Sequence, residues 1–221
     1  QYFSFIVTLK ISFAVYIKDN VLEHLNRRKM KKILYCVLLV FLMQPPPTLF
    51  AQLNFSARIV KDNLFIPWEI IYGPDDHIWF TQKNGYVCRL DPVSGQLDTI
   101  YHEAQTVINN EGGMLGMALH PQFASDPYVF VAYEYETGED YKERVVRYTY
   151  AGGVLTAPQI LIDDIEGASI HNGCRLAIYG DKLFITTGDA ANTALPQNIN
   201  SLNGKVLRIN LDGSIPADNP Y

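Results

Sequence analysis

Cysteine is scarce in this sequence of 221 residues, and basic side chains are in the minority. Three cysteines are too few for a disulfide-rich scaffold or for a zinc site with four cysteine ligands. The 18 Lys and Arg against 23 Asp and Glu give a formal net charge of -5. A nucleic-acid-binding protein needs a basic surface that neutralises phosphates. We therefore expect no nucleic-acid partner.

A helical hydrophobic period is also missing after residue 52. Aromatic residues are plentiful instead, with 14 Tyr and 11 Phe. These side chains suit the pleated, half-buried surface of a sheet. Short aromatic and β-branched runs, separated by turn signals at regular spacing, predict an all-β protein.

The first part of the chain differs in charge from the rest. Residues 1–51 hold seven of the 18 basic residues and two of the 23 acidic ones, so 52–221 carries 11 basic and 21 acidic. Within 30–51, Met30 and two lysines precede the apolar run 33–43, and small residues end at Ala51. This pattern predicts a signal peptide over 30–51, and hence a secreted or periplasmic protein without a stable membrane span after cleavage. An uncleaved N-terminal anchor is the alternative.

Residues 1–29 precede this pattern and open with Gln1, not methionine. We interpret them as an upstream extension outside the fold, either translated from before the true start or a genuine membrane-proximal segment. The fold is then expected in 52–221, where Cys88 and Cys174 remain. Sequence alone leaves open whether these two cysteines form a disulfide.

The part after residue 52 repeats itself. Segments 72–91 and 179–210 each read as turn, strand, connection, glycine, strand with Arg, and turn, and 120–150 forms a third unit. Units roughly 40–60 residues apart predict the blades of a β-propeller, whereas a sandwich explains neither the repeat nor its length. Closed propellers have ~4–8 blades, so about three blades predict the N-terminal part of a longer protein.

Three polar residues are candidates for chemistry. Glu111 precedes a pair of glycines, which let a backbone approach a ligand or another strand closely, although a structural turn is the favoured interpretation. His171 lies at a loop-to-strand junction, where an imidazole can act as a general base or be merely exposed. Asp189 leaves the next strand and could orient His171, bind a polyol or form an Asx turn.

Five strings occur in the order found in the soluble quinoprotein glucose dehydrogenases, also called glucose/sorbosone or aldose sugar dehydrogenases, and together they resemble that family. They cover essentially all of 64–221 and are Pro67-Trp68-Glu69-Ile70, Glu111-Gly112-Gly113-Met114-Leu115-Gly116 with His120-Pro121-Gln122-Phe123, His171-Asn172-Gly173-Cys174-Arg175-Leu176, Thr187-Gly188-Asp189, and Asn203-Gly204-Lys205-Val206-Leu207-Arg208-Ile209 with Asp212-Gly213-Ser214-Ile215-Pro216-Ala217-Asp218-Asn219-Pro220.

The resemblance implies a six-bladed propeller that uses pyrroloquinoline quinone (PQQ) and calcium to oxidise an aldose at its anomeric hydroxyl. It places His171 on the catalytic base, Asp189 on the acidic residue beside it, and Glu111 on a position that contacts the sugar. Hydride would pass to the quinone, with calcium as a Lewis acid, and electrons would leave to an acceptor that the sequence does not identify.

Two departures accompany the resemblance. Cys174 stands where the family usually has a second glycine. The family places most of its quinone and calcium ligands beyond the position of residue 221, so the chain as given is expected to be inactive alone.

Two other functions compete. A calcium-dependent propeller lactonase would need oxygen ligands converging on the central channel, to which Asp189, Asn172 and Glu111 could contribute. A non-enzymatic carbohydrate-binding propeller would present exposed aromatic rings for stacking on sugars, with Trp68, Trp79 and Tyr135 as candidates, although core or blade packing is the favoured explanation of these rings.

Overall fold

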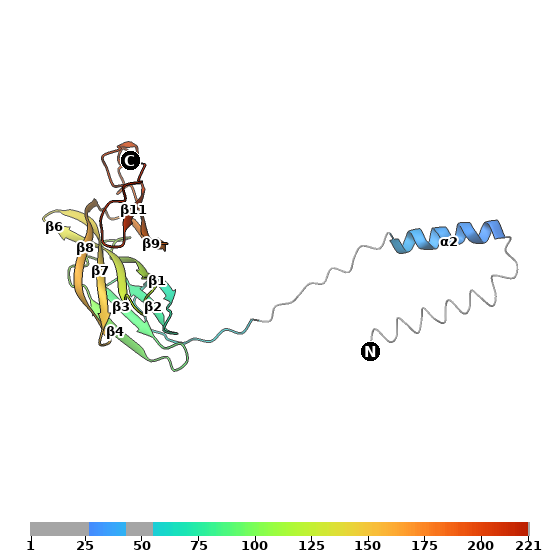
Figure 1. Cartoon of the computed structure of the whole chain (residues 1–221), viewed down its shortest axis with the longest axis horizontal. Coiled ribbons are helices and arrows are strands. Elements are labelled where there is room, and N and C mark those ends of the chain that lie inside the picture. Colours follow the sequence, from blue (N-terminus) through green and yellow to red (C-terminus); the bar gives the residue numbers. More distant parts are fainter. Residues whose placement is uncertain (1–26, 43–54, 221) are drawn as a thin grey trace. The chain divides into compact units, whose positions relative to one another are not determined.

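The structure is a computed structural model that describes residues 27–42 and 55–220. The chain divides into two units, Gln1–Ser56 and Ala57–Tyr221, which are described separately. The described part of the first unit is helix α2, Arg27–Leu42 (blue in Figure 1), which contains the basic and apolar parts of the predicted signal peptide. No helix in the described residues has the length and apolar character needed to cross a membrane. The predicted cleavage point after Ala51 lies outside the described residues.

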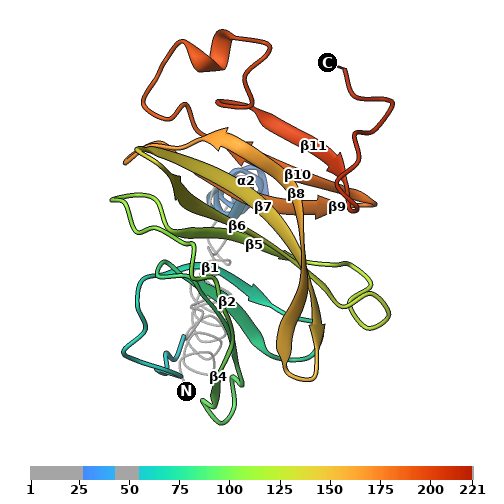
Figure 2. The same ribbon diagram turned by 90° about the vertical axis from the view of Figure 1, so that its left-hand side faces the viewer.

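The second unit is built from three antiparallel sheets, as Figure 2 shows. Sheet 1 has the order β1-β2-β3-β4, sheet 2 the order β5-β6-β7-β8, and sheet 3 the order β11-β10-β9. The strands are β1 (Pro67–Tyr72), β2 (Ile78–Gln82), β3 (Tyr86–Leu90), β4 (Leu97–His102), β5 (Met114–Leu119), β6 (Tyr128–Thr137), β7 (Asp140–Ala151), β8 (Val154–Glu166), β9 (Gly173–Tyr179), β10 (Lys182–Thr187) and β11 (Val206–Asn210). The helical content of this unit in the described residues is one short 3-10 turn, Leu195–Gln197, so the all-β prediction is confirmed.

The three sheets are successive blades of a partial β-propeller, as the sequence repeat predicted. The segments that were aligned form equivalent strand pairs, β2 with β3, β6 with β7, and β10 with β11. Strands β1, β5 and β9 begin their sheets, and β5 packs against both of the others. The glycine-rich stretch interpreted as a turn is a turn only as far as Gly113, because β5 begins at Met114. Strand β5 is buried on both faces and therefore lacks the alternation that reveals a strand.

The core lies on both faces of sheet 2. On β6, Val129, Val131 and Tyr133 join a cluster with Trp79, Val87 and Ile100 of sheet 1. The intervening residues Phe130 and Ala132 join Leu176, Leu183 and Ile185 of sheet 3. Successive side chains of a strand point to opposite faces, so one face of β6 packs against sheet 1 and the other against sheet 3. The same alternation directs the next residue, Glu134, toward sheet 3.

Candidate active site

The three residues predicted for chemistry lie together at one end of the blades. Glu111 precedes β5, His171 precedes β9, and Asp189 follows β10. Strands β9 and β10 are antiparallel, so the start of the one meets the end of the other, with Gly173 opposite Thr187. Strand β5 packs beside β9, which brings Glu111 to the same place. The structure therefore assembles a cluster from residues up to 78 positions apart in the sequence.

The His171 imidazole is oriented by Asp189. Its Nδ1 lies 2.9 Å from Asp189 Oδ1. An ionised carboxylate only accepts hydrogen bonds, so Nδ1 carries the hydrogen and donates it. Nε2 of the neutral ring is then left with its lone pair, which is the form that can accept a proton. The His171 side chain is 56% exposed, so a substrate can reach this nitrogen.

Asp189 is itself fixed by the turn that follows β10. Its Oδ1 accepts the backbone N–H of Ala191 at 3.0 Å, and the N–H of Ala190 donates to the carbonyl of His171 at 3.2 Å. The Asp189 side chain is largely buried beside the open histidine, at 22% exposure. The turn thus holds the carboxylate in place and connects it by a hydrogen bond to the main chain of His171.

Glu111 forms a hydrogen bond with the backbone of His171. Its Oε2 accepts the His171 N–H at 2.7 Å, and its own N–H donates to the Ser169 carbonyl at 2.9 Å. His171 has φ 61, a left-handed conformation that is uncommon for a residue with a side chain. The two hydrogen bonds of Glu111, with the His171 N–H and with the Ser169 carbonyl, stabilise this conformation. Glu111 therefore links the loop before β5 to the loop before β9.

The loop that carries His171 is packed closely against Asn172 and Gly188. Asn172 is buried, and its side-chain amide accepts from Ala168 N–H at 2.9 Å and donates to the Ala168 carbonyl at 2.8 Å. Gly188 lies against the main chain of this loop, and a Cβ on Gly188 would overlap the His171 carbonyl oxygen. Only glycine permits this close approach of the two backbones.

Cys174, the first departure from the family pattern, occupies a position that suits glycine. It has φ 55, a conformation that glycine adopts without strain, and its side chain is fully buried between sheets 2 and 3. Its Sγ donates to Glu143 Oε2 at 3.2 Å, and burial raises the pKa of the thiol well above its ordinary value. Cys88 lies in another core cluster, beside Phe80 and Leu90. Both cysteines are free, so no disulfide joins them.

The other described histidines have different surroundings. His77 Nδ1 lies 2.7 Å from the Asp75 carbonyl, in the turn between β1 and β2. His102 stacks on Tyr86 with ring centroids 4.3 Å apart. His120 packs edge-on against Tyr128 and accepts the N–H of Gln122 at 3.2 Å. His77 and His120 thus serve turns at the opposite end of the strands from His171.

The aromatic residues considered for sugar stacking are mostly buried. Trp79 has no exposed surface, and its ring meets Phe123 and Tyr150 edge-on. Tyr135 is 8% exposed and donates its hydroxyl hydrogen to Asp163 at 2.6 Å. Both rings therefore serve the packing of the blades, as the sequence favoured, and neither is available for stacking on a sugar. Trp68 remains exposed.

Two buried ionisable residues near the site were missed by the sequence analysis. Lys83 follows β2 and is 7% exposed, and its ammonium donates to the Asn110 carbonyl beside Glu111. Its Nζ also lies 5.6 Å from the centre of the Trp68 ring. Glu134 has no exposed surface and lies on β6. Single charged residues within strand-forming sequence carry no motif, so no local signal identified either.

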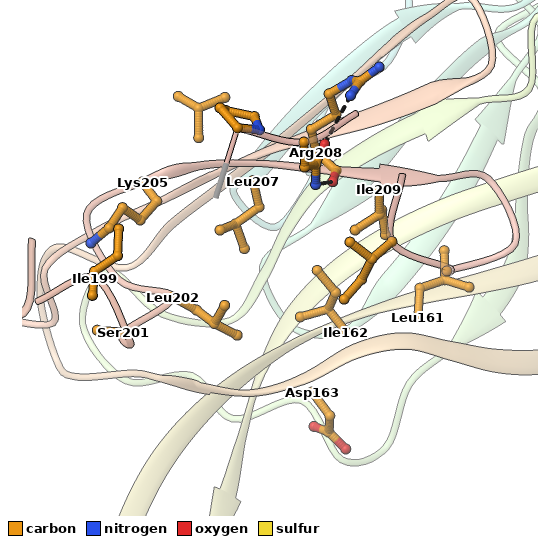
Figure 3. Close-up of a pocket in the computed structure, with 15 residues that line it drawn as sticks. Leu161, Ile162, Asp163, Ile199, Ser201, Leu202, Lys205, Leu207, Arg208 and Ile209 are labelled. Carbon is orange, nitrogen blue, oxygen red and sulfur yellow. Dashed lines mark hydrogen bonds between the residues drawn. The ribbon is translucent and has the colours of Figure 1, made fainter. Parts of the chain in front are cut away.

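Within 27–42 and 55–220, no group of three His, Cys, Asp or Glu side chains is arranged to hold a metal ion. A hollow of about 540 Å³ lies between β8 and the segment 199–220, as Figure 3 shows. Its lining is mainly apolar and includes Leu161, Ile162, Leu202 and Leu207, and none of the three predicted site residues borders it. The cluster of Glu111, His171 and Asp189 is therefore separate from this hollow.

Comparison with known proteins finds relatives of this chain in sequence and in fold. Quinoprotein glucose dehydrogenase B of Acinetobacter calcoaceticus is 32% identical in an alignment 208 residues long, which covers 79% of this chain and 44% of that protein. The PQQ-bound aldose sugar dehydrogenase of Streptomyces coelicolor has a TM-score of 0.67 at 32% identity, covering 74% of this chain and 50% of that one. A structure from Thermus thermophilus, described as a putative oxidoreductase (glucose dehydrogenase), has a TM-score of 0.67 at 30% identity, with coverages of 73% and 49%.

The chain thus spans about half the length of the relatives it matches. Residues 64–221 match the family described as glucose/sorbosone dehydrogenase. That range contains the three blades and the cluster of Glu111, His171 and Asp189. The chain belongs to the glucose/sorbosone dehydrogenase family.

Proposed function

We propose that the protein oxidises an aldose at its anomeric hydroxyl with PQQ as the electron acceptor, and that His171 is the general base. The observation that carries the proposal is the hydrogen bond of 2.9 Å between His171 Nδ1 and Asp189, on a histidine whose side chain is open to solvent. A sugar hydroxyl is a weak acid, so removal of hydride from its carbon requires a base that takes the proton in the same step.

Each member of the cluster then has a part. His171 Nε2 accepts the proton of the anomeric hydroxyl. Asp189 keeps the opposite ring nitrogen protonated and stabilises the imidazolium that forms, as third groups do in triads. Glu111 Oε2 holds the His171 backbone at 2.7 Å, which leaves Oε1 for a hydroxyl of the sugar. Such fixed positioning is worth several powers of ten in rate.

The cofactors belong to the proposal as well. PQQ, when bound, supplies the electrophile that takes up the anomeric hydrogen as hydride. The exposed side chain of His171 leaves room for a sugar and a quinone to lie against its Nε2. We also propose calcium as a second cofactor of the whole protein, on the resemblance to the family. The described residues do not fit a calcium site, since they bring together no group of three His, Cys, Asp or Glu side chains.

We test the function with the protein expressed from its complete gene and loaded with PQQ and calcium. An aldose is expected to reduce the quinone, which is followed by its absorbance. The matching 1,5-anhydro sugar keeps the ring but lacks the anomeric hydroxyl, so it is expected to leave the quinone oxidised. Equal reduction by both sugars, or reduction by neither, would contradict the proposed reaction.

We further propose that the protein is exported, secreted or periplasmic, with cleavage after Ala51. The support is the pattern of Met30, two lysines and an apolar run, together with the charge difference between 1–51 and the rest. N-terminal sequencing of the exported protein is expected to begin at Gln52. An exported protein that retains Met30 would show that the segment is an uncleaved anchor.

A further inference from the structure

A buried carboxyl group lies directly behind the cluster of Glu111 and His171. Glu134 is the residue of β6 that follows the core residues Phe130 and Ala132 on the face toward sheet 3, and it has no exposed surface. Its backbone N–H donates to the Gly113 carbonyl at 2.9 Å, and its carbonyl accepts the N–H of Val107 at 3.0 Å. The main chain of Glu134 is therefore bonded to the segment that carries Glu111.

The side chain of Glu134 fills the space between the two loops of the site. A Cβ on Gly112 would overlap Glu134 Oε1, and one on Gly167 would lie 3.2 Å from Oε2. Gly112 follows Glu111 directly, and Gly167 precedes Ala168, whose main chain is bonded to the Asn172 amide. The carboxyl thus touches the backbone next to Glu111 on one side and the loop of His171 on the other.

This contact is not explained by an ordinary hydrogen-bond network. Neither carboxyl oxygen of Glu134 has a hydrogen-bond partner among the described residues, and Asn109 Nδ2 beside it also has none. A buried polar group without a partner is destabilising by about 1–3 kcal/mol, and such groups are rare in native proteins. The carboxyl thus lacks the hydrogen bonds that would compensate its burial, although the amides of Asn109 and Asn172 and the ammonium of Lys83 lie near it.

We propose that Glu134 is a positioning residue, whose carboxyl sets the distance between the Glu111 loop and the His171 loop. The proposal rests on the function proposed above for His171, but the position of the loops can be measured without it. It assigns Glu134 no contact with substrate. The side chain acts through the backbone next to Glu111 and through the loop that Asn172 supports.

A second buried carboxyl makes the position of Glu134 dependent on pH. Glu143 of β7 is paired with Glu134 across the strands, so the two side chains share one face of the sheet. Burial raises the pKa of Glu134 to about 7, and burial with the charge of Glu134 raises that of Glu143 to about 8. The groups that face the pair are the ammonium of Lys83, the amides of Asn109 and Asn172, and the thiol of Cys174.

The direction of the pH dependence follows from these shifts. Both carboxyl groups have a pKa above the ordinary value of about 4.3, so the folded state favours the protonated forms. Their contribution to stability is fully present below about pH 4.3 and is lost as the pH rises through about 7 to 8. Loss of the first proton places a charge between the two loops, and loss of the second adds repulsion between the carboxylates.

Replacement of Glu134 by glutamine tests the proposal, because the amide has the shape of the protonated carboxyl and does not ionise. In the protein from its complete gene, the amide NMR shifts of Glu111 and His171 are expected to coincide in wild type and E134Q at pH 5.5. At pH 9 they are expected to differ, because only the wild type then carries a charge at position 134, between the two loops, whereas Glu143 is ionised in both proteins. The melting temperature is expected to fall less between these pH values in E134Q.

Two more variants complete the experiment. Glu136→Gln changes an exposed glutamate of the same strand, and its amide shifts are expected to match the wild type at both pH values. Glu134→Ala leaves a cavity between the loops and is expected to move the amide shifts at both pH values. It is also expected to lower kcat by up to about 10²-fold, since small displacements of a base are costly in rate.

The outcomes separate the two proposals. Coincident Glu111 and His171 shifts in wild type and E134Q at pH 9 would overturn the positioning role, and so would unchanged shifts in folded E134A. A wild-type protein without quinone-dependent oxidation would overturn the proposed function, while the amide shifts would still decide the role of Glu134.

Discussion

Replacement of His171 by alanine is expected to lower turnover of the quinone-loaded protein by ~10²–10⁴-fold, the usual contribution of a general base. The described residues provide no other imidazole with an aspartate partner at this end of the blades. Quinone binding is expected to change little, because His171 is exposed and supports no part of the core. Turnover with a saturating aldose and quinone titration measure the two quantities separately.

His120 provides the matched control. Its ring packs on Tyr128 at the far end of β5, where it stabilises a turn. We expect His120→Ala to lower the melting temperature and to leave kcat nearly unchanged. A His171→Ala variant with near wild-type turnover would transfer the role of the base to Glu111 or Asp189.

Replacement of Asp189 by asparagine is expected to lower kcat nearly as much as loss of the histidine. An amide can offer its N–H to His171 Nδ1 and thereby favour the tautomer in which Nε2 carries the hydrogen. The base then lacks a lone pair toward the substrate although the geometry is kept. Steady-state kinetics of D189N, with the affinity for the quinone measured in parallel, check this expectation.

Asp181 is the control for this substitution. It is exposed in the turn after β9 and pairs with Lys182 at 2.7 Å, far along the strand from His171. Asp181→Asn is expected to retain full turnover. If D189N also retained it, Asp189 would serve only the turn with Ala191, and the orientation of the imidazole would have another source.

The repeat in the sequence predicted the blades because a turn, a strand, a glycine and a second strand recur in them. Strands β2 and β3 present this pattern, and so do β10 and β11. Strand β5 does not, since both of its faces are buried and its residues are apolar or small without alternation. Its position became apparent only from its packing between β1 and β9.

The cluster of His171, Asp189 and Glu111 was predicted because each residue stands in a string that resembles the family. Their contacts could not be predicted in the same way. The hydrogen bond from the His171 backbone to Glu111 depends on the left-handed conformation of one residue and on the approach of two blades. No sequence pattern identified Glu134, because the role proposed for it depends on its burial and its contacts in space and not on its neighbours along the chain.

The central claim is that His171 takes the proton in the step that reduces the quinone. The most direct test is a single turnover, in which the quinone-loaded protein is mixed rapidly with an aldose and the absorbance of the quinone is followed. The rate of reduction is expected to fall in His171→Ala by the same factor as steady-state turnover, ~10²–10⁴-fold. Rapid reduction of the quinone in that variant, with only later steps slowed, would contradict the claim.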